Sequence, residues 1–220
     1  MSYLVDPGDV AVDIGAHVGW YTRVLAEIVG HRGTVYSIEP VPETFRLLSS
    51  VVDALGLKNV RLVNCALSDQ GGLAIMAIPV ADGGVENLYR ARIVEGVGSG
   101  LGGNSVAVPK ISLDSMLSNC SDDIGFIKCD VEGHESFVLR GAIQVIEKWR
   151  PAWLIEVANG CSEICSRTSE VYGFLAEYGY RPYWFDGSRL RNPNPFEGAV
   201  NYFFLQPPHL RRIGDRGIAI

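Results

Sequence analysis

The chain opens with a hydrophobic pattern that predicts a strand followed directly by a helix. Residues 10–16 (VAVDIGA) form a short run that is rich in β-branched apolar residues, which is typical of a buried parallel strand. Apolar residues then recur at helical spacing over residues 18–29, and Gly30 ends that pattern. The opening segment therefore predicts a strand, a tight turn and a helix.

The same unit repeats along the next segment. Residues 34–39 (TVYSIE) predict a second strand, and Pro42 begins a second helix whose apolar face continues to Leu55. Residues 60–66 predict a third strand. Strands that alternate with helices in this way indicate an α/β fold with a doubly wound parallel sheet.

The alternation breaks in the middle of the chain, over an insertion of about residues 73–113. Residues 73–79 and 105–113 predict strands, and residues 83–103 between them hold seven glycines with little apolar periodicity. Because glycine leaves the backbone free and is common at hinges, we expect this glycine-rich stretch to be a flexible lid over the bound substrate.

The alternation of strand and helix returns in the second half of the chain. The predicted elements are strands at residues 124–130 and 153–157 and helices at about residues 135–149 and 168–178. Two final strands, at residues 181–186 and 201–206, flank a connection that is too short for a helix, so we expect them to form an antiparallel pair.

The chain length predicts one domain. With 220 residues, the chain is long enough for one sizeable core and short for two ordinary domains. We assign this domain to residues 1–207 and expect residues 208–220 to form a flexible tail.

Charge and cysteine content exclude several classes of protein. Lys and Arg number 19 against 25 Asp and Glu, a formal net charge of −6, so we expect no nucleic-acid partner. The sequence contains no long apolar run and no signal-peptide pattern, so we expect a cytoplasmic protein without a membrane partner. Five cysteines without CxxC spacing argue against a disulfide framework or a zinc ribbon.

The first turn predicts a nucleoside-binding site. Asp13 ends the first strand, and Gly15 and Gly19 lie over the start of the helix. Ligands of open α/β sheets bind beyond the carboxyl ends of the strands, where Glu39 of the next strand can accept both hydroxyls of a ribose.

The same turn discriminates between two nucleoside cofactors. A dinucleotide fingerprint requires glycine where His17 and Trp20 stand, so NAD is disfavoured. The pattern D-x-G-x-x-x-G fits S-adenosylmethionine (SAM) instead, with S-adenosylhomocysteine (SAH) as its product. We interpret His17 as a residue that either contacts the cofactor or caps the turn.

Six segments in order extend this interpretation to a family. They are VDIGAHVGWYT at residues 12–22, YSIEPVPETFRLL at 36–48, NCALSDQGG at 64–72, VPKISLDSML at 108–117, FIKCDVEGHESFVLRGA at 126–142 and WLIEV at 153–157. With these segments the chain resembles the FkbM-type SAM-dependent methyltransferases, and the K-x-D-V-E-G-x-E block is the most specific part of the resemblance.

The resemblance implies a class I, Rossmann-like methyltransferase fold with a seven-stranded sheet whose last strand is antiparallel. It also implies which residues bind SAM. From the methionine end through the ribose to the adenine, these are Asp13, Gly15, Gly19, Glu39, Ser68 and Asp69.

The end of the fourth predicted strand of the sheet offers three candidate catalytic residues. Asp130 follows a strand adjacent to the first one, so it should face the methyl group of the cofactor. Glu132 and His134 follow it in the turn. We expect Asp130 to be indispensable and His134 to accept the proton, because neutral imidazole is an effective base near pH 7.

Nearby charged residues have structural alternatives. Glu135 is interpreted as a complement to the start of the next helix. Glu156 could join Asp130 as a ligand of a divalent metal ion, but a capping or hydrogen-bonding role is favoured and metal dependence stays open. Lys128 is interpreted as a structural residue or salt-bridge partner on the strand face opposite to Asp130.

The leading functional hypothesis is an O-methyltransferase that acts on a hydroxyl of a small molecule, either a sugar or a specialised metabolite. An N- or carboxyl methyltransferase and a SAM-fold module without turnover are the alternatives. The sequence leaves the acceptor and the oligomeric state open, and a homo-oligomer is compatible with it.

Overall fold

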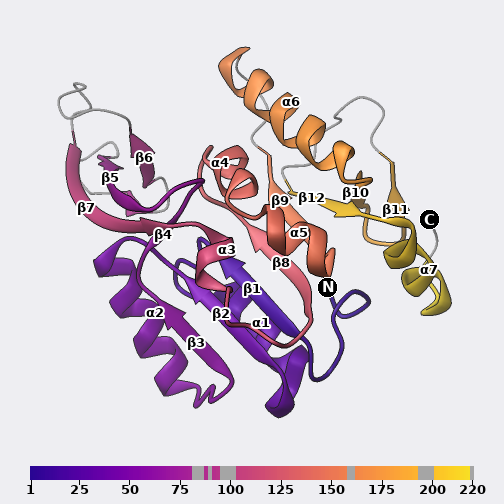
Figure 1. Cartoon of the computed structure of the whole chain (residues 1–220). Coiled ribbons are helices and arrows are strands. Elements are labelled where there is room, and N and C mark those ends of the chain that lie inside the picture. The colour runs from indigo at the N-terminus through magenta and orange to yellow at the C-terminus, as the bar shows by residue number, and fades with distance from the viewer. Residues whose placement is uncertain (81–86, 89–90, 95–102, 158–161, 193–200, 219–220) are drawn as a thin grey trace.

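Two β-sheets organise the computed structural model of the chain (Figure 1). The structure describes residues 1–80, 87–88, 91–94, 103–157, 162–192 and 201–218. The larger sheet has eight strands in the order β11-β10-β12-β9-β8-β1-β2-β3. Its strands are β1 (Val10–Ile14), β2 (Thr34–Ile38), β3 (Val60–Val63), β8 (Ile124–Cys129), β9 (Ala152–Glu156), β10 (Arg181–Phe185), β11 (Leu190–Arg191) and β12 (Asn201–Leu205).

The strand directions confirm the predicted fold class. β3, β2, β1, β8 and β9 pair in parallel, whereas β12 runs antiparallel to both of its neighbours, β9 and β10. The short strand β11 is an addition to the seven expected strands. Since β1, β2, β8 and β9 are parallel, their carboxyl ends meet at one edge of the sheet, where α/β folds bind ligands.

Helices cover both faces of the larger sheet. They are α1 (Trp20–Val29), α2 (Pro42–Ala54), α3 (Leu113–Met116), α4 (Glu135–Arg140), α5 (Ile143–Trp149), α6 (Ser162–Glu177) and α7 (Pro207–Asp215), with a 3-10 turn at Gly30–Arg32. Successive strand residues point to opposite faces, so Val12 packs into a cluster with Leu139 of α4, while Ala11 packs into another with Leu25 of α1. Among the described residues, no helix has the length and apolar character needed to cross a bilayer.

The insertion forms a second sheet in the order β4-β7-β5-β6. Its strands are β4 (Ala66–Leu67), β5 (Gly72–Pro79), β6 (Arg92–Val94) and β7 (Gly103–Ile111). The expectation of a lid over residues 83–103 is wrong for β6, which pairs with β5; residues 83–86, 89–90 and 95–102 of that stretch lie outside the described residues. The predicted strand at 105–113 ends earlier, because the Ser112 side chain caps α3.

The helix predicted over residues 135–149 is two helices. Gly141 ends α4 just before α5 begins. A Cβ atom at this position would lie 2.1 Å from the backbone oxygen of Ser68, so only glycine allows the two chain segments to approach this closely. Helical periodicity continues across Gly141 and does not reveal this tertiary contact.

The flexible tail predicted from residue 208 is corrected over most of its length, because α7 occupies residues 207–215. Gln206 and His209 form a reciprocal capping box at its start. Ile213 is buried in the cluster around α1, and Arg212 forms ion pairs with Asp6 and Asp9 near the N-terminus. A side-chain cap and a buried isoleucine therefore fix this helix against the sheet.

We predict that Ile213→Ala lowers the free energy of unfolding by about 2–5 kcal/mol, because it leaves a cavity in a packed cluster. Arg211→Ala changes an exposed side chain of the same helix and should cost less than about 0.5 kcal/mol. Urea unfolding of both variants measures the difference. Equal stabilities would contradict the packing of α7.

Candidate active site

A pocket of about 250 Å³ lies at the carboxyl ends of β1, β2, β8 and β9. Its charged lining residues are Glu39, Asp130, Glu132 and Glu156, and the described residues that line it include no Lys or Arg. Gly15 and His17 contribute the turn after β1. Cys65, which follows β3, and apolar residues of the second sheet close another side. The pocket thus combines an acidic end with an apolar wall, which suits a ligand that carries both cationic and apolar groups.

Gly15 allows β1 and β8 to meet at the floor of this pocket. It has φ +73, and a Cβ atom there would lie 1.8 Å from the backbone oxygen of Asp130. The Asp130 backbone N–H donates to the Ile14 carbonyl oxygen at 3.1 Å. Gly19 is required for helix packing, because a Cβ atom there would lie 2.7 Å from the Leu48 side chain of α2. Gly15 therefore lines the pocket, whereas the structure shows Gly19 as a packing position.

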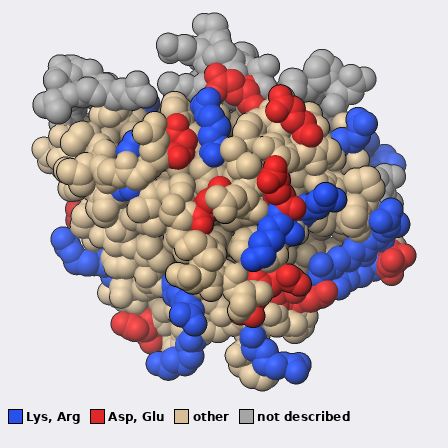
Figure 2. Space-filling view, in the orientation of Figure 1, with Lys and Arg blue, Asp and Glu red and all other residues tan. Residues whose placement is uncertain are grey.

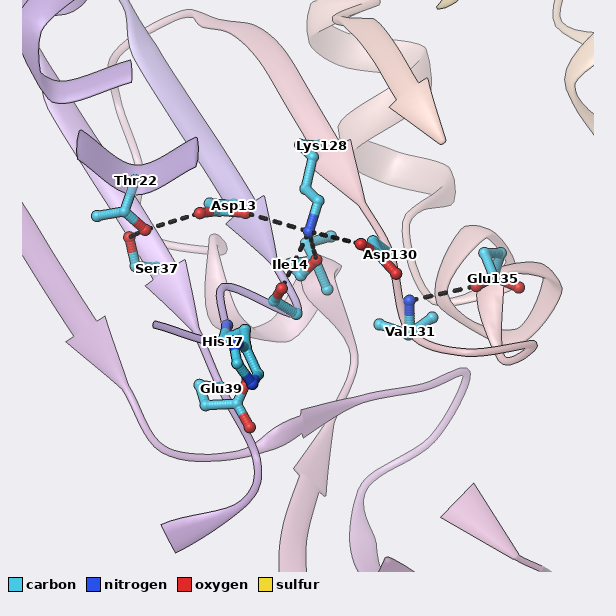
Figure 3. A network of polar contacts seen from close by, with 11 residues as sticks. Asp13, Ile14, His17, Thr22, Ser37, Glu39, Lys128, Asp130, Val131 and Glu135 are labelled. Atoms are coloured by element: carbon cyan, nitrogen blue, oxygen red, sulfur yellow. Dashed lines mark hydrogen bonds and ion pairs between the residues drawn. The ribbon is translucent and has the colours of Figure 1, made fainter. Parts of the chain in front are cut away.

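Lys128 connects the turn after β1 to the end of β8 (Figure 3). Its buried Nζ donates to the carbonyl oxygen of Gly15 at 3.0 Å and lies 3.4 Å from that of Ile14. The same ammonium is 3.6 Å from Asp13 Oδ1 and 3.3 Å from Asp130 Oδ2. Burial lowers the pKa of Lys128, but Asp13 and Asp130 outweigh it and raise the pKa overall. Lys128 therefore remains charged and holds two carboxylates.

The salt-bridge interpretation of Lys128 is confirmed, but its expected orientation is wrong. Lys128 and Asp130 are two residues apart and so belong to the same face of the strand, and their side chains meet. The signal in the sequence was a lysine within an apolar strand, because a buried ammonium requires partners.

Asp13 is placed differently from the expectation that it contacts the methionine end of SAM. It is fully buried and is not among the residues that line the pocket. Its Oδ2 accepts a hydrogen bond of 2.7 Å from Thr22, whose hydroxyl also lies 2.8 Å from that of Ser37. Asp13 therefore acts on the pocket through Lys128.

Glu39 lies at the end of β2 with its carboxylate held in place. Its Oε2 accepts the backbone N–H of His17, and its Oε1 accepts that of Val41, both at 3.0 Å. Burial raises the pKa of Glu39, and these two donors oppose that effect. A carboxylate has about four acceptor positions, so those left after these two bonds can accept ribose hydroxyls.

His17 also lines the pocket, in a backbone conformation with φ 48 that is uncommon outside glycine. Burial, followed by the charge of Lys128, lowers its pKa. The imidazole is therefore neutral at pH 7 and adds no positive charge to the pocket.

Asp130 and Glu156 form an acid pair at the ends of adjacent strands β8 and β9. Both line the pocket, and a side-chain hydrogen bond to Asp130 is among the causes that raise the pKa of Glu156. Burial, this hydrogen bond and the charges of Asp130 and Glu132 raise the pKa of Glu156 to about 8. The pair therefore shares one proton at neutral pH. The favoured hydrogen-bonding role of Glu156 agrees with this arrangement.

Glu132 lines the same end of the pocket, whereas His134 does not belong to the lining residues. The His134 ring stacks on Phe137, and its Nε2 lies 3.0 Å from the Ser68 hydroxyl. Ser68 also donates to Asp69, and neither of these two residues lines the pocket. The structure thus groups His134, Ser68 and Asp69 with one another, which disfavours His134 as the base and the Ser68 and Asp69 side chains as adenine ligands.

Glu135 lies in the first turn of α4, as expected, but its carboxylate accepts hydrogen bonds from the turn that precedes the helix. Its Oε1 accepts the backbone N–H groups of Val131 at 3.2 Å and Gly133 at 3.1 Å. Burial raises its pKa. These bonds fix the turn that carries Glu132 into the pocket. Within the described part of the chain, no three His, Cys, Asp or Glu side chains are arranged to hold a metal ion.

Comparison with known proteins identifies the family of this chain. The model of the methyltransferase FkbM domain matches residues 13–182. The chain belongs to the FkbM methyltransferase family. This confirms the resemblance drawn from the sequence, and it makes the matched region a SAM-dependent methyltransferase domain of class I fold.

The FkbM domain also shares a short segment with protein-L-isoaspartate O-methyltransferases. That of Methanococcus maripaludis is 37% identical over 59 residues, 27% of this chain and 28% of the relative. One from Archaeoglobus fulgidus is 39% identical over 56 residues, 26% of each chain. The match therefore spans between a quarter and a third of the relatives' length.

Solved structures show the same fold at low identity. An FkbM methyltransferase from Methylobacillus flagellatus aligns with a TM-score of 0.58 and 16% identity, over 91% of this chain and 44% of that one. Aeropyrum pernix fibrillarin with bound SAM aligns with a TM-score of 0.53 and 14% identity, over 91% and 67%.

We predict that Lys128→Met destabilises the protein by about 3–5 kcal/mol, because it leaves Asp13 buried without its counter-charge. Lys148→Met removes an exposed lysine and should change the free energy of unfolding by less than about 0.5 kcal/mol. Chemical unfolding measures both. A Lys128→Met variant as stable as the wild type would show that the buried charges are not coupled.

Proposed function

We propose that this chain is a SAM-dependent O-methyltransferase whose acceptor is a hydroxyl of a small molecule, a sugar or a specialised metabolite. The observation that carries this proposal is the Asp130–Glu156 acid pair in the pocket, beside the turn that holds the cofactor. A hydroxyl is a weak nucleophile, so methyl transfer to it is faster when a nearby group accepts its proton.

The residues of the pocket fit SAM. Its sulfonium and ammonium groups are cations, and four acidic side chains line the pocket without a Lys or Arg among the described lining residues, so the pocket stays negative even though Asp130 and Glu156 share one proton. The same charges would repel a pyrophosphate, which supports the expectation that NAD does not bind. Glu39 presents the acceptor positions that a ribose diol requires.

SAM supplies an electrophilic methyl group on its sulfonium when it is bound. The chain has to hold the acceptor in line with that group and remove one proton. The carboxylate oxygens of Asp130 and Glu156 receive the hydroxyl proton, while Lys128 holds Asp130 in position. The apolar residues on the other side of the pocket limit the access of water to the same position.

Alternative acceptors fit this pocket less well. The partial relatives are named protein-L-isoaspartate O-methyltransferases, so a carboxylate acceptor is an alternative. A carboxylate would be repelled by Glu132 and by the one negative charge that the Asp130–Glu156 pair keeps at neutral pH. An amine acceptor would tolerate the acidic end of the pocket and would need no strong base. A binding module without turnover would not need a proton acceptor, so it would not explain the acid pair.

The proposed function is tested with labelled SAM and a panel of acceptors. We expect methyl transfer to neutral glycosides or hydroxylated macrolides, and none to an isoaspartyl peptide, because the acidic lining disfavours a carboxylate. Each reaction is run with and without EDTA. Transfer only to the peptide or to amines would contradict O-methylation of a hydroxyl, and complete inhibition by EDTA would indicate a metal.

The acid pair predicts a specific pH dependence. A base accepts a proton only after losing its own, so kcat/KM should rise with pH through about 8, the pKa of Glu156. Glu156→Gln should remove this rise and lower kcat by roughly 10²- to 10⁴-fold.

His134→Ala serves as the matched variant, because its ring lies outside the pocket lining. It should keep the rise near pH 8. If the rise of kcat/KM near pH 8 were lost in His134→Ala and kept in Glu156→Gln, His134 would be the general base.

A further inference from the structure

We propose that the second sheet binds the adenine of the cofactor, through an apolar wall formed by Met76, Leu88, Ala91 and Ile93. We call these four residues the adenine wall. The inference rests on the proposed use of SAM, and it assigns a ligand to an insertion for which the sequence suggested only a lid over the substrate.

The adenine wall belongs to the pocket and not to a separate cavity. All four of its residues line the same pocket as Glu39, Asp130 and Glu156. They also share a hydrophobic cluster with Val41 and Ala66. The wall therefore faces the segment between β2 and α2 and the start of β4, where apolar packing continues directly into the pocket.

The wall is held by strand pairing. Met76 of β5 and Ile93 of β6 are direct partners in the antiparallel ladder, so their side chains stand on the same face of the second sheet. The Asn87 backbone N–H donates to the Pro79 carbonyl oxygen at 2.7 Å, which ties the residues next to Leu88 back to the end of β5. A paired strand presents a fixed surface, as a flat aromatic ring requires.

The position of Glu39 orients the cofactor relative to this wall. Glu39 would hold the ribose, and the acid pair Asp130–Glu156 marks the end where the methyl group reacts. The adenine must then extend away from the acid pair, past Glu39 toward Val41 and Ala66. Figure 3 shows Glu39 on the side of the turn away from Asp130, toward the strands at the lower edge of the view.

The apolar side chains of the wall also suit the adenine ring better than they suit a hydroxylated acceptor. The faces of a purine are apolar and gain free energy from burial against aliphatic side chains. The polar side chains once expected near the adenine, Ser68 and Asp69, are hydrogen-bonded to each other outside the pocket lining. Recognition of the base therefore rests on apolar packing.

The test compares the binding of SAH and of adenosine by calorimetry. Ile93→Ala should weaken both by about the same factor, roughly 5- to 30-fold, because each buried methylene contributes about 0.8 kcal/mol. Adenosine lacks the methionine part, so an equal loss for both ligands locates the effect at the nucleoside. Leu73→Ala, which removes a 73% exposed side chain of β5 outside the pocket, should leave both affinities unchanged.

Two further variants separate binding from folding. Ile93→Val keeps most of the surface and should restore affinity to within about threefold of the wild type. Ala91→Phe fills the pocket from a position beside β6 and should weaken adenosine binding at least as much as Ile93→Ala, even if the latter unfolds. Thermal unfolding of every variant accompanies the titrations.

Unchanged SAH and adenosine affinities in Ile93→Ala and Ala91→Phe, with a raised KM for the acceptor, would assign the wall to the acceptor and overturn this inference. A wild-type protein that binds SAH and adenosine but transfers no methyl group to any hydroxyl would contradict the proposed function and leave the adenine wall in place.

Discussion

The buried ammonium of Lys128 holds together the two chain segments on which the site depends. It contacts the Ile14 and Gly15 carbonyl oxygens from the turn after β1 and the Asp130 carboxylate from the end of β8. Asp13 supplies a second negative charge from within the sheet. A buried cation is stable only when its charge and its hydrogen bonds are satisfied, so this arrangement fixes the turn and the strand relative to each other.

The acid pair follows from that constraint. Lys128 forms an ion pair with Asp130, and the charges of Asp130 and Glu132 add to burial in raising the pKa of Glu156 at the end of the adjacent strand. Two carboxylates that meet in a partly buried pocket cannot both ionise easily, so one proton stays between them. The parallel sheet creates this proximity, because it brings the ends of β8 and β9 to one edge. The acidic lining that results also matches a cationic cofactor.

The face of the molecule in Figure 2 places acidic and basic side chains side by side among the described residues, so opposite charges partly compensate one another there. The pocket differs, because its charged lining is acidic and its remaining lining is largely apolar. The specificity of this chain therefore depends on two elements of different origin. The strand ends of the larger sheet provide charge and proton transfer, and the inserted sheet provides apolar surface.

The sequence by itself determined the elements whose periodicity is local. The βαβαβ unit, the antiparallel terminal strands and the positions of Glu39 and Asp130 at strand ends could all be read from spacing and residue type. The tertiary structure alone decided what distant segments do to each other. The backbone of Ser68 lies against Gly141, between α4 and α5, and its hydroxyl contacts His134. The capping box and Ile213 order α7, and pairing with β5 orders β6 within a glycine-rich stretch. These outcomes depend on contacts between residues far apart in the chain. Hydrophobic periodicity shows which face of an element is apolar, but it does not show which other element packs against that face.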